Sequence, residues 1–203
     1  MSIEKTRERK SREMRREQIA QAALRIIAQR GVRALTTASI AQEVGVSEAN
    51  LYRHFENKDE ILSEMVEVIG SDLMRSFADI FGSDGDPAGK LKRVFLFHLT
   101  LIESNEGIPR LVFSEEMHRG NRDLREKFLA LITRYTEHLR LLIREGQEVG
   151  AFRRTLDPLQ TATLFIGMVQ ISTLLWSLKG FTYSLVDEGM KMWENFEKCI
   201  RTE

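Results

Sequence analysis

Apolar residues recur at helical spacing along almost the entire chain, and no segment shows the sustained alternation that is typical of a β-strand. Such helical patterns cover residues 12–30, 57–81, 88–104, 108–118, 121–149, 157–178 and 185–201. Gly31, Pro109 and Pro158 lie where helices commonly end or begin. Together with two shorter helices in residues 35–55, these patterns predict an all-α protein of about nine helices.

Residues 35–55 contain two short amphipathic patterns on either side of Gly45. Their apolar positions are Ile40, Ala41, Val44, Val46, Leu51 and Phe55. Gly45 suits a left-handed residue that ends one helix, and the Ser47 side chain suits the start of the next. This is the pattern of a helix-turn-helix, whose second helix lies in the DNA major groove, a space about 12 Å wide. That recognition helix is predicted at residues 47–54.

We divide the chain into an N-terminal part that contains the helix-turn-helix, called the head, and a larger helical part that follows it, called the body. We expect a three-helix DNA-binding head over residues 1–60 and a larger helical bundle over residues 61–203. The linker is placed within the helix at 57–81, because its first turn must pack on the head while its end reaches the Gly- and Asp-rich loop at 82–89.

Charge is balanced over the whole chain, with 30 basic and 30 acidic residues, but it is not evenly distributed. Residues 1–60 carry twelve Lys or Arg against nine Asp or Glu, and residues 1–16 carry seven against three. A basic arm ahead of a helix-turn-helix suits contact with phosphates. A solvated tail is an equally good interpretation of the same residues.

The remaining composition favours a cytoplasmic protein. The single Cys199 and the hydrophilic first residues favour a reducing compartment without a secretory signal. Residues 159–178 carry no charge, yet their many Thr, Ser and Gln side chains favour a helix buried in protein over one that spans a membrane.

Motifs of enzymes and metal sites are missing from the sequence. It has no phosphate-binding loop, no Gly-rich dinucleotide turn, no nucleophile elbow and no paired Cys. Glu115 and His118 form one Glu-x-x-His motif, but a di-iron bundle needs two copies. Asp84 and Asp86 lack the other ligands of a calcium loop. We therefore expect no enzymatic activity, no cofactor and no metal.

Two runs of sequence resemble the tetracycline-repressor (TetR) family of bacterial transcription regulators: TTASIAQEVGVS at 36–47 and LYRHFENKDEIL at 51–62. The resemblance covers about residues 12–65, and beyond them only the helical outline and LIREGQEVGAF at 142–152 echo it. It implies a homodimer with one head per subunit, and a ligand-responsive body in which residues 61–203 form the ligand-binding and dimerisation domain. It also implies a double-stranded DNA operator of palindromic sequence.

The resemblance also assigns roles within the head. Thr37, Tyr52, His54 and Lys58 match positions that contact phosphates, although a helix cap for Thr37 and helix packing for the others are alternatives. Base reading is expected from the remaining positions of the recognition helix, because Asn can pair with adenine, Arg with guanine and Glu with cytosine. These positions are Ser47, Glu48, Ala49, Asn50 and Arg53.

Ten of the eleven Phe residues lie beyond residue 60, so the body can line an apolar cavity. The candidates for a ligand pocket are Phe95, His98, Phe113, Met117, Phe128, Tyr135, Phe165 and Met168. An ordinary hydrophobic core is the alternative for most of them. An apolar or aromatic effector is expected.

The segment 159–178 is the predicted subunit interface, in which Gly167 allows close approach and Trp176 supplies apolar area. The helix at 185–201 would complete four helices around a two-fold axis, with packing inside one subunit as the alternative.

These features predict a ligand-responsive, sequence-specific transcription regulator, expected to be a repressor that a small effector releases from DNA. The mechanism is a population shift toward a dimer whose heads no longer match successive major grooves. Two alternatives remain open: a helical ligand-binding or adaptor protein without sequence-specific use of DNA, and a helical enzyme with an unrecognised site.

Overall fold

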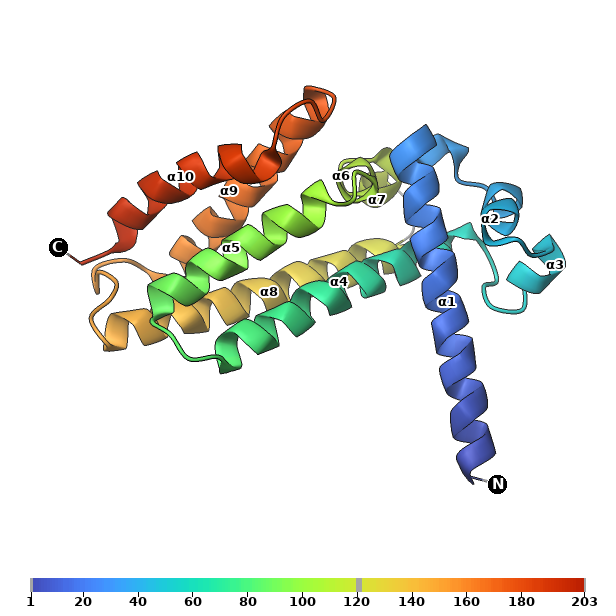
Figure 1. Ribbon diagram of the computed structural model, residues 1–203, viewed down its shortest axis with the longest axis horizontal. Helices are drawn as coiled ribbons and strands as arrows, with labels where there is room; N and C mark the ends of the chain where they lie inside the picture. The colour runs from blue at the N-terminus through green and yellow to red at the C-terminus, as the bar shows by residue number, and fades with distance from the viewer. Residues whose placement is uncertain (1, 120–121, 203) are drawn as a thin grey trace. The chain divides into compact units, whose positions relative to one another are not determined.

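The computed structural model describes residues 2–119 and 122–202, with side chains described from Arg12 onward except at position 119. Most of the predicted basic arm at 1–16 therefore lies outside the described side chains. Within the described residues the chain forms ten α-helices and one 3-10 turn, and the predicted all-α class is confirmed (Figure 1).

The helices follow in the order α1 (Ser2–Arg30), η1 (Val32–Ala34), α2 (Thr37–Val44), α3 (Glu48–Leu51), α4 (Lys58–Gly82), α5 (Pro87–Glu103), α6 (Gly107–Val112), α7 (Glu115–Arg119), α8 (Arg122–Glu148), α9 (Pro158–Leu178) and α10 (Leu185–Ile200).

One predicted helix, at 108–118, is two helices in the structure. α6 ends before Phe113, and the Ser114 hydroxyl accepts a hydrogen bond from the Met117 backbone N–H at 3.2 Å, so Ser114 starts α7 as a cap does. Most other predicted helix ends are close to the observed ones, because Asp86 and Asp157 cap α5 and α9 directly before Pro87 and Pro158. The extra break accounts for ten helices where nine were expected.

Packing divides the chain into two compact units. The head unit contains the chain up to Gly70 together with Asn105–Phe128, and the body unit contains Ser71–Ser104 and the chain from Leu129 onward. α4 therefore contributes its first half to the head unit and its second half to the body unit. The predicted functional boundary at residue 60 stays a prediction, since these units are defined by packing alone.

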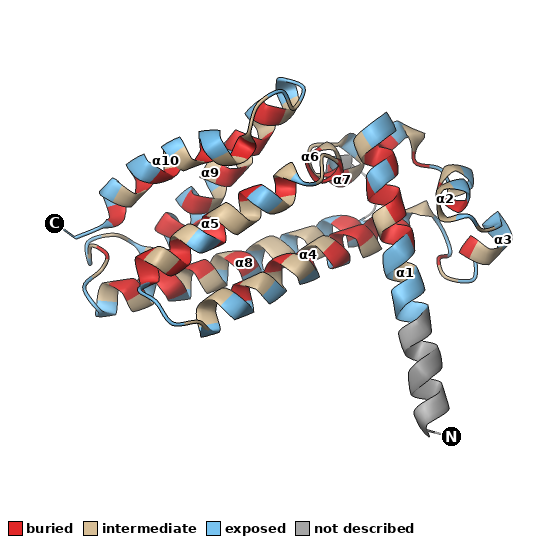
Figure 2. Ribbon diagram, viewed as in Figure 1, coloured by how far each residue is buried: buried red, intermediate tan, exposed pale blue. Residues whose placement is uncertain are grey.

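The head unit is built on the second half of α1, whose buried face includes Ile19, Ala23 and Ile27 (Figure 2). α2 covers this face with Ile40, which is fully buried. α6 packs against the α1 backbone itself, because a Cβ at Gly107 would lie 2.4 Å from the Leu24 carbonyl oxygen. Glycine at this position lets α6 approach α1 closely, and the segment 105–128 thereby belongs to the same packed unit as the helix-turn-helix.

An aromatic cluster forms the core of the body unit. The Phe95 ring of α5 lies 5.4 Å from Phe165 of α9 and 5.6 Å from Trp193 of α10, and all three side chains are fully buried. Gly189 lets α10 approach α5 closely, because a Cβ at this position would lie 2.2 Å from the Leu99 side chain. Three helices are thus held together by aromatic packing and one small residue.

Trp176 packs in the core of its own subunit, so the prediction that it contributes apolar area to a subunit interface is wrong. Its side chain is 3% exposed, its indole N–H donates to the Tyr183 carbonyl at 2.7 Å, and the Phe181 ring lies 4.7 Å away. Phe181 closes this contact with a left-handed backbone at φ 62°. A tryptophan that is satisfied in this way has no free face for a partner.

The opposite face of α9 is apolar and exposed. The large exposed side chains on this helix are Leu159, Leu164, Ile171, Leu175 and Leu178. By length and composition alone α9 could cross a membrane, and 39% of its apolar 18-residue stretch is buried inside the chain. Its buried hydroxyls have partners, since Thr173 donates to the Val169 carbonyl at 2.7 Å and Ser172 donates to the Met192 sulfur at 3.1 Å. α9 therefore has one packed face and one uncovered apolar face.

Candidate DNA-binding surface

Thr36, rather than Thr37, caps the first helix of the helix-turn-helix. Its hydroxyl accepts from the Ser39 backbone N–H at 3.0 Å, and the Ser39 hydroxyl accepts from the Thr36 N–H at 2.9 Å. This reciprocal pair satisfies two backbone donors that the helix itself leaves without partners. Thr37 is therefore the first residue inside α2, and its hydroxyl takes no part in the cap.

The turn has the geometry that the sequence predicts. Gly45 is left-handed, at φ 75° and ψ 35°, and the Val46 N–H returns to the Ala41 carbonyl at 2.9 Å. The Ser47 hydroxyl then accepts from the Asn50 N–H at 3.2 Å and begins α3. Two caps and one glycine fix the angle between α2 and α3.

The recognition helix is irregular at its end. Only Glu48–Leu51 is regular α-helix, but the turn continues through 3-10 bonds from the Arg53 N–H to the Asn50 carbonyl at 3.1 Å and from the His54 N–H to the Leu51 carbonyl at 2.9 Å. The predicted span of residues 47–54 is therefore helical in character, although shorter as an α-helix.

The inner and outer faces of this helix are clearly separated. Leu51 and Phe55 are buried, whereas Tyr52 is 53% exposed, which weighs against helix packing as its role. Ser47, Glu48, Ala49 and Arg53 are also exposed, while Thr37, Asn50, His54 and Lys58 are half-buried. All nine predicted DNA contacts thus lie at the helix-turn-helix or at the first residue of α4, and none is fully buried.

Arg16 fixes the end of the recognition helix, although the sequence did not single it out. Its guanidinium donates to the His54 carbonyl, lies 4.1 Å from the centre of the Phe55 ring, and pairs with Glu60 at 2.8 Å and Glu64 at 2.6 Å. It therefore joins α1, the end of the recognition helix and the first turns of α4. The only sequence signal is the pair of acids four residues apart.

His54 is held neutral by its surroundings. Burial, and then the positive charges of Arg12, Arg15, Arg16 and Arg53, lower the pKa of His54. Its buried Nδ1 has no hydrogen-bond partner among the described atoms. A neutral imidazole can still donate one N–H to a phosphate.

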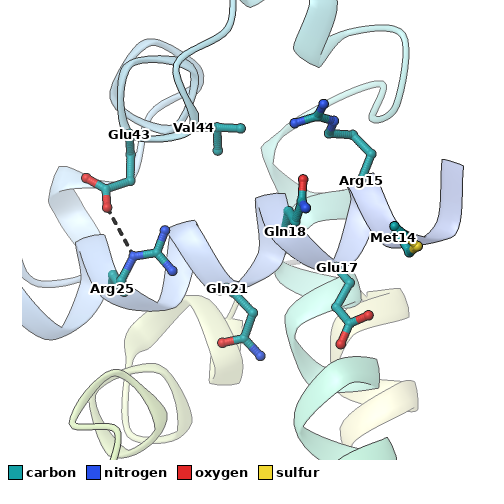
Figure 3. A pocket seen from close by; sticks show the side chains of 8 residues that line it. All are labelled: Met14, Arg15, Glu17, Gln18, Gln21, Arg25, Glu43 and Val44. Carbon is teal, nitrogen blue, oxygen red and sulfur yellow. Dashed lines mark hydrogen bonds and ion pairs between the residues drawn. The ribbon is translucent and has the colours of Figure 1, made fainter. Parts of the chain in front are cut away.

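A shallow groove of about 440 Å³ runs along α1 beside α2 in the head unit (Figure 3). Its lining residues are Met14, Arg15, Glu17, Gln18, Gln21, Arg25, Glu43 and Val44. The Arg25 guanidinium spans it to Glu43 at 3.1 Å. Opposite charges alternate along its walls, so the groove has no overall preference for anions or cations.

The predicted pocket residues fall into both units. Phe113, Met117 and Phe128 belong to the head unit, whereas Phe95, His98, Tyr135, Phe165 and Met168 belong to the body unit. Phe95 and Phe165 lie in the aromatic core described above, and Met168 is half-buried. Their role in binding a ligand remains a prediction.

One polar pair lies inside this apolar body. The His98 Nδ1 is 2.7 Å from the Tyr135 hydroxyl, and the Phe77 ring packs edge-on against Tyr135 at 4.6 Å. Burial lowers the pKa of His98 to about 4 and raises the pKa of Tyr135 well above its usual value. Both side chains are therefore uncharged at neutral pH.

Comparison with known proteins decides the family. Residues 19–65 match the bacterial regulatory proteins of the tetR family, and residues 87–195 match the tetracyclin repressor-like C-terminal domain. The chain belongs to the TetR family. It is a DNA-binding transcription regulator with a helix-turn-helix head and a ligand-binding C-terminal domain, and family members act as dimers.

Relatives of this regulator include the nucleoid occlusion factor SlmA of Vibrio cholerae, which is 34% identical over 170 residues, 83% of this chain and 87% of that protein. The transcriptional regulator FadR of Bacillus subtilis, solved in complex with stearoyl-CoA, is 26% identical with a TM-score of 0.76, covering 88% of this chain and 96% of that one. A TetR-family regulator from Agrobacterium tumefaciens is 16% identical with a TM-score of 0.80, covering 94% and 100%, and shows the fold alone.

The half-buried His98 should make the stability of the regulator depend on pH. Its folded pKa of about 4 lies below the unfolded value of about 6.5, so its stabilising effect is complete above pH 6.5 and is lost as the pH falls toward 4. Between pH 7 and pH 5 this loss reaches up to about 2 kcal/mol. We expect His98→Gln to remove that part of the pH dependence in urea unfolding.

Tyr135→Phe is the matched control, because it removes the hydroxyl partner but leaves the His98 imidazole in place. It should keep the dependence on pH that His98→Gln loses. If the free energy of unfolding falls equally with pH in the wild-type protein and in His98→Gln, His98 titrates normally in the folded state.

Proposed function

We propose that this regulator binds a palindromic operator as a homodimer, represses transcription there, and leaves the DNA when a small apolar effector binds its body. The observation that carries the DNA-binding part is the outer face of the recognition helix. Glu48, Ala49, Tyr52 and Arg53 are exposed together on a short helix that the buried Leu51 anchors. Such a face fits the major groove.

The proposed contacts divide into two kinds. Thr37, Tyr52, His54 and Lys58 supply donors to phosphates, which position the head without reading sequence. The base-reading side chains are those of Ser47, Glu48, Ala49, Asn50 and Arg53. Asn50 suits this role because only its backbone N–H serves the cap from Ser47, which leaves its side-chain amide for a base.

Two substitutions in the recognition helix separate these roles. Tyr52→Phe removes one donor and should lower affinity for every sequence alike, by about threefold to tenfold. Asn50→Ala should instead change the preferred base at one position, worth about 1–3 kcal/mol of discrimination. The measurement is selection of duplexes from a random pool, followed by titration of the selected duplex and a scrambled one. The opposite pattern would mean that the helix faces are misassigned.

The dimer is proposed to form through the uncovered face of α9. Leu164, Ile171 and Leu175 follow one another at helical spacing on that face, and Gly167 lies among them with open space around it. A second copy of the same face would bury this stripe symmetrically. Two heads separated by one helical turn of DNA, about 34–36 Å, read enough base pairs for useful specificity.

A charge on this face should break the dimer. Leu175→Glu should cost about 2 kcal/mol or more at each of two symmetric positions, and operator binding should be lost with the dimer. Sedimentation velocity gives the mass of the species. Leu141→Glu on α8 is the control, since Leu141 is 47% exposed and Leu175 is 45% exposed. A Leu175→Glu protein that stays dimeric would exclude this face.

The effector is proposed to be an apolar molecule. Support comes from the aromatic body, from its uncharged His98 and Tyr135 pair, and from the stearoyl-CoA complex of the Bacillus subtilis relative. The head unit contains the segment 105–128, and Gly107 packs on the Leu24 backbone. A shift of that segment on ligand binding would therefore reach α1 and change the spacing of the heads.

Stearoyl-CoA is a suitable probe for this effector, with free coenzyme A as its control. Stearoyl-CoA should weaken binding to the selected duplex, and the duplex should weaken binding of stearoyl-CoA by the same factor, because the coupling of two binding sites is reciprocal. Fluorescence anisotropy of the duplex and calorimetry of the ligand measure the two sides. Unchanged affinity for the duplex would exclude long-chain acyl-CoA as the effector.

Nucleoid occlusion is a second candidate, favoured by 34% identity with the Vibrio cholerae factor over head and body together. Selection of fragments from genomic DNA separates the two candidates. Few fragments near promoters support a repressor, whereas many fragments distributed over the chromosome support nucleoid occlusion.

A further inference from the structure

A hydrogen bond joins the two helices of the DNA-binding motif across the turn. The Thr37 hydroxyl donates to the Glu48 carboxylate at 2.8 Å, connecting the first residue of α2 to the first residue of α3. Thr36 caps α2, so this hydroxyl is not needed there. Glu48 is exposed, so its carboxylate lies at the surface that faces DNA in the proposed function.

The charge of Glu48 is unfavourable at such a place. Among residues 47–54 it is the only acid, and Arg53 is the only Lys or Arg. DNA carries one negative charge for about every 1.7 Å of its axis, and a carboxylate can only accept hydrogen bonds. In the major groove the partners for such an acceptor are the amino groups of cytosine and adenine. Elsewhere on DNA the carboxylate meets acceptors and phosphates, which repel it.

The Thr37 hydroxyl has a single proton and can give it to only one acceptor. While it donates to Glu48 it cannot donate to a phosphate. A phosphate contact from this hydroxyl therefore requires that the Glu48 carboxylate find another donor, and the base edges supply one only at particular sequences.

We propose that the Thr37–Glu48 hydrogen bond couples phosphate binding to base reading and makes Glu48 a determinant of specificity. This rests on the proposed binding of an operator. At a matching sequence, a base amino group donates a hydrogen bond to the Glu48 carboxylate, and the Thr37 hydroxyl donates to a phosphate instead. At other sequences the hydroxyl stays with Glu48, the phosphate contact is lost, and an unneutralised carboxylate faces the DNA. Glu48 thus acts mainly by weakening binding to wrong sequences.

Glu48→Gln tests the charge, because it keeps the shape and an acceptor for Thr37. Each protein selects duplexes from a random pool, and its affinity is then measured for the wild-type selected duplex and for a scrambled duplex at one salt concentration. We expect Glu48→Gln to bind the scrambled duplex about tenfold tighter, within the usual effect of one base pair, and to lose the wild-type preference at one base pair in each half-site.

Thr37→Val tests the coupling. An uncoupled phosphate contact lowers affinity for all sequences alike, as expected for Tyr52→Phe. Under the proposal, Thr37→Val instead weakens the selected duplex more than the scrambled one, and Thr37→Ser restores the difference because it keeps the hydroxyl. The cap of α2 comes from Thr36 and Ser39, so Thr37→Val leaves it in place, and thermal unfolding checks this.

Glu56→Gln is the matched control for charge, because Glu56 is another exposed acid of the head unit outside the recognition turn. It should change both affinities by the same factor. The proposal is overturned if Glu48→Gln leaves the ratio of the two affinities unchanged, or if Thr37→Val lowers both equally. A wild-type protein that selects no sequence at all would instead overturn the proposed function, so the two failures are distinguishable.

Discussion

The Arg16 guanidinium of α1 contacts both the end of the recognition helix and the first turns of α4, and these contacts constrain the position of the recognition helix. This helix is short and irregular at its end, where two 3-10 bonds stand beside one α-helical bond from the Phe55 N–H to the Leu51 carbonyl at 3.1 Å. Arg16 holds that end through the His54 carbonyl and the Phe55 ring, while Glu60 and Glu64 neutralise its charge. Both ion pairs are partly buried, where screening by salt is weaker than at the open surface. The recognition helix is therefore positioned by α1 and α4 together.

The local devices of the head were predictable from the sequence because each depends on residues close together in the chain. Gly45 ends α2, Ser47 starts α3, and Leu51 and Phe55 face inward, all at positions that spacing alone gives. Arg16 was not predictable in this way, since its partners are 38 to 48 residues away and a basic residue near the start of a chain suits a solvated arm equally well. That Thr36 and not Thr37 caps α2 was also visible only in the structure.

In the body the helices were predictable from the sequence, but the faces that they bury were not. Helical spacing predicted the helices, but it could not tell which aromatic residue faces the subunit's own core and which faces a partner. Trp176 and Leu175 are neighbours on α9, yet the tryptophan is buried with a satisfied N–H and the leucine is exposed. The larger side chain was the natural prediction for an interface. In the structure, the loop that carries Phe181 and Tyr183 packs against Trp176 and covers it within its own subunit. Segments that close over a helix face are set by tertiary structure.

Under the proposed function the protein must find one operator in a chromosome, and its binding to all other DNA limits it. A recognition surface made only of donors and positive charge would bind any duplex tightly, because phosphates are everywhere. Here the recognition helix combines one arginine, Arg53, with one acid, Glu48. The Glu48 carboxylate accepts a hydrogen bond from the Thr37 hydroxyl, which the family resemblance assigns to a phosphate contact. Burial and the surrounding arginines lower the pKa of His54, so its proposed phosphate contact would add a donor without adding charge. In this proposal the head offers hydrogen bonds in place of additional charge, which would have strengthened binding to every sequence equally. Specificity is a difference between affinities.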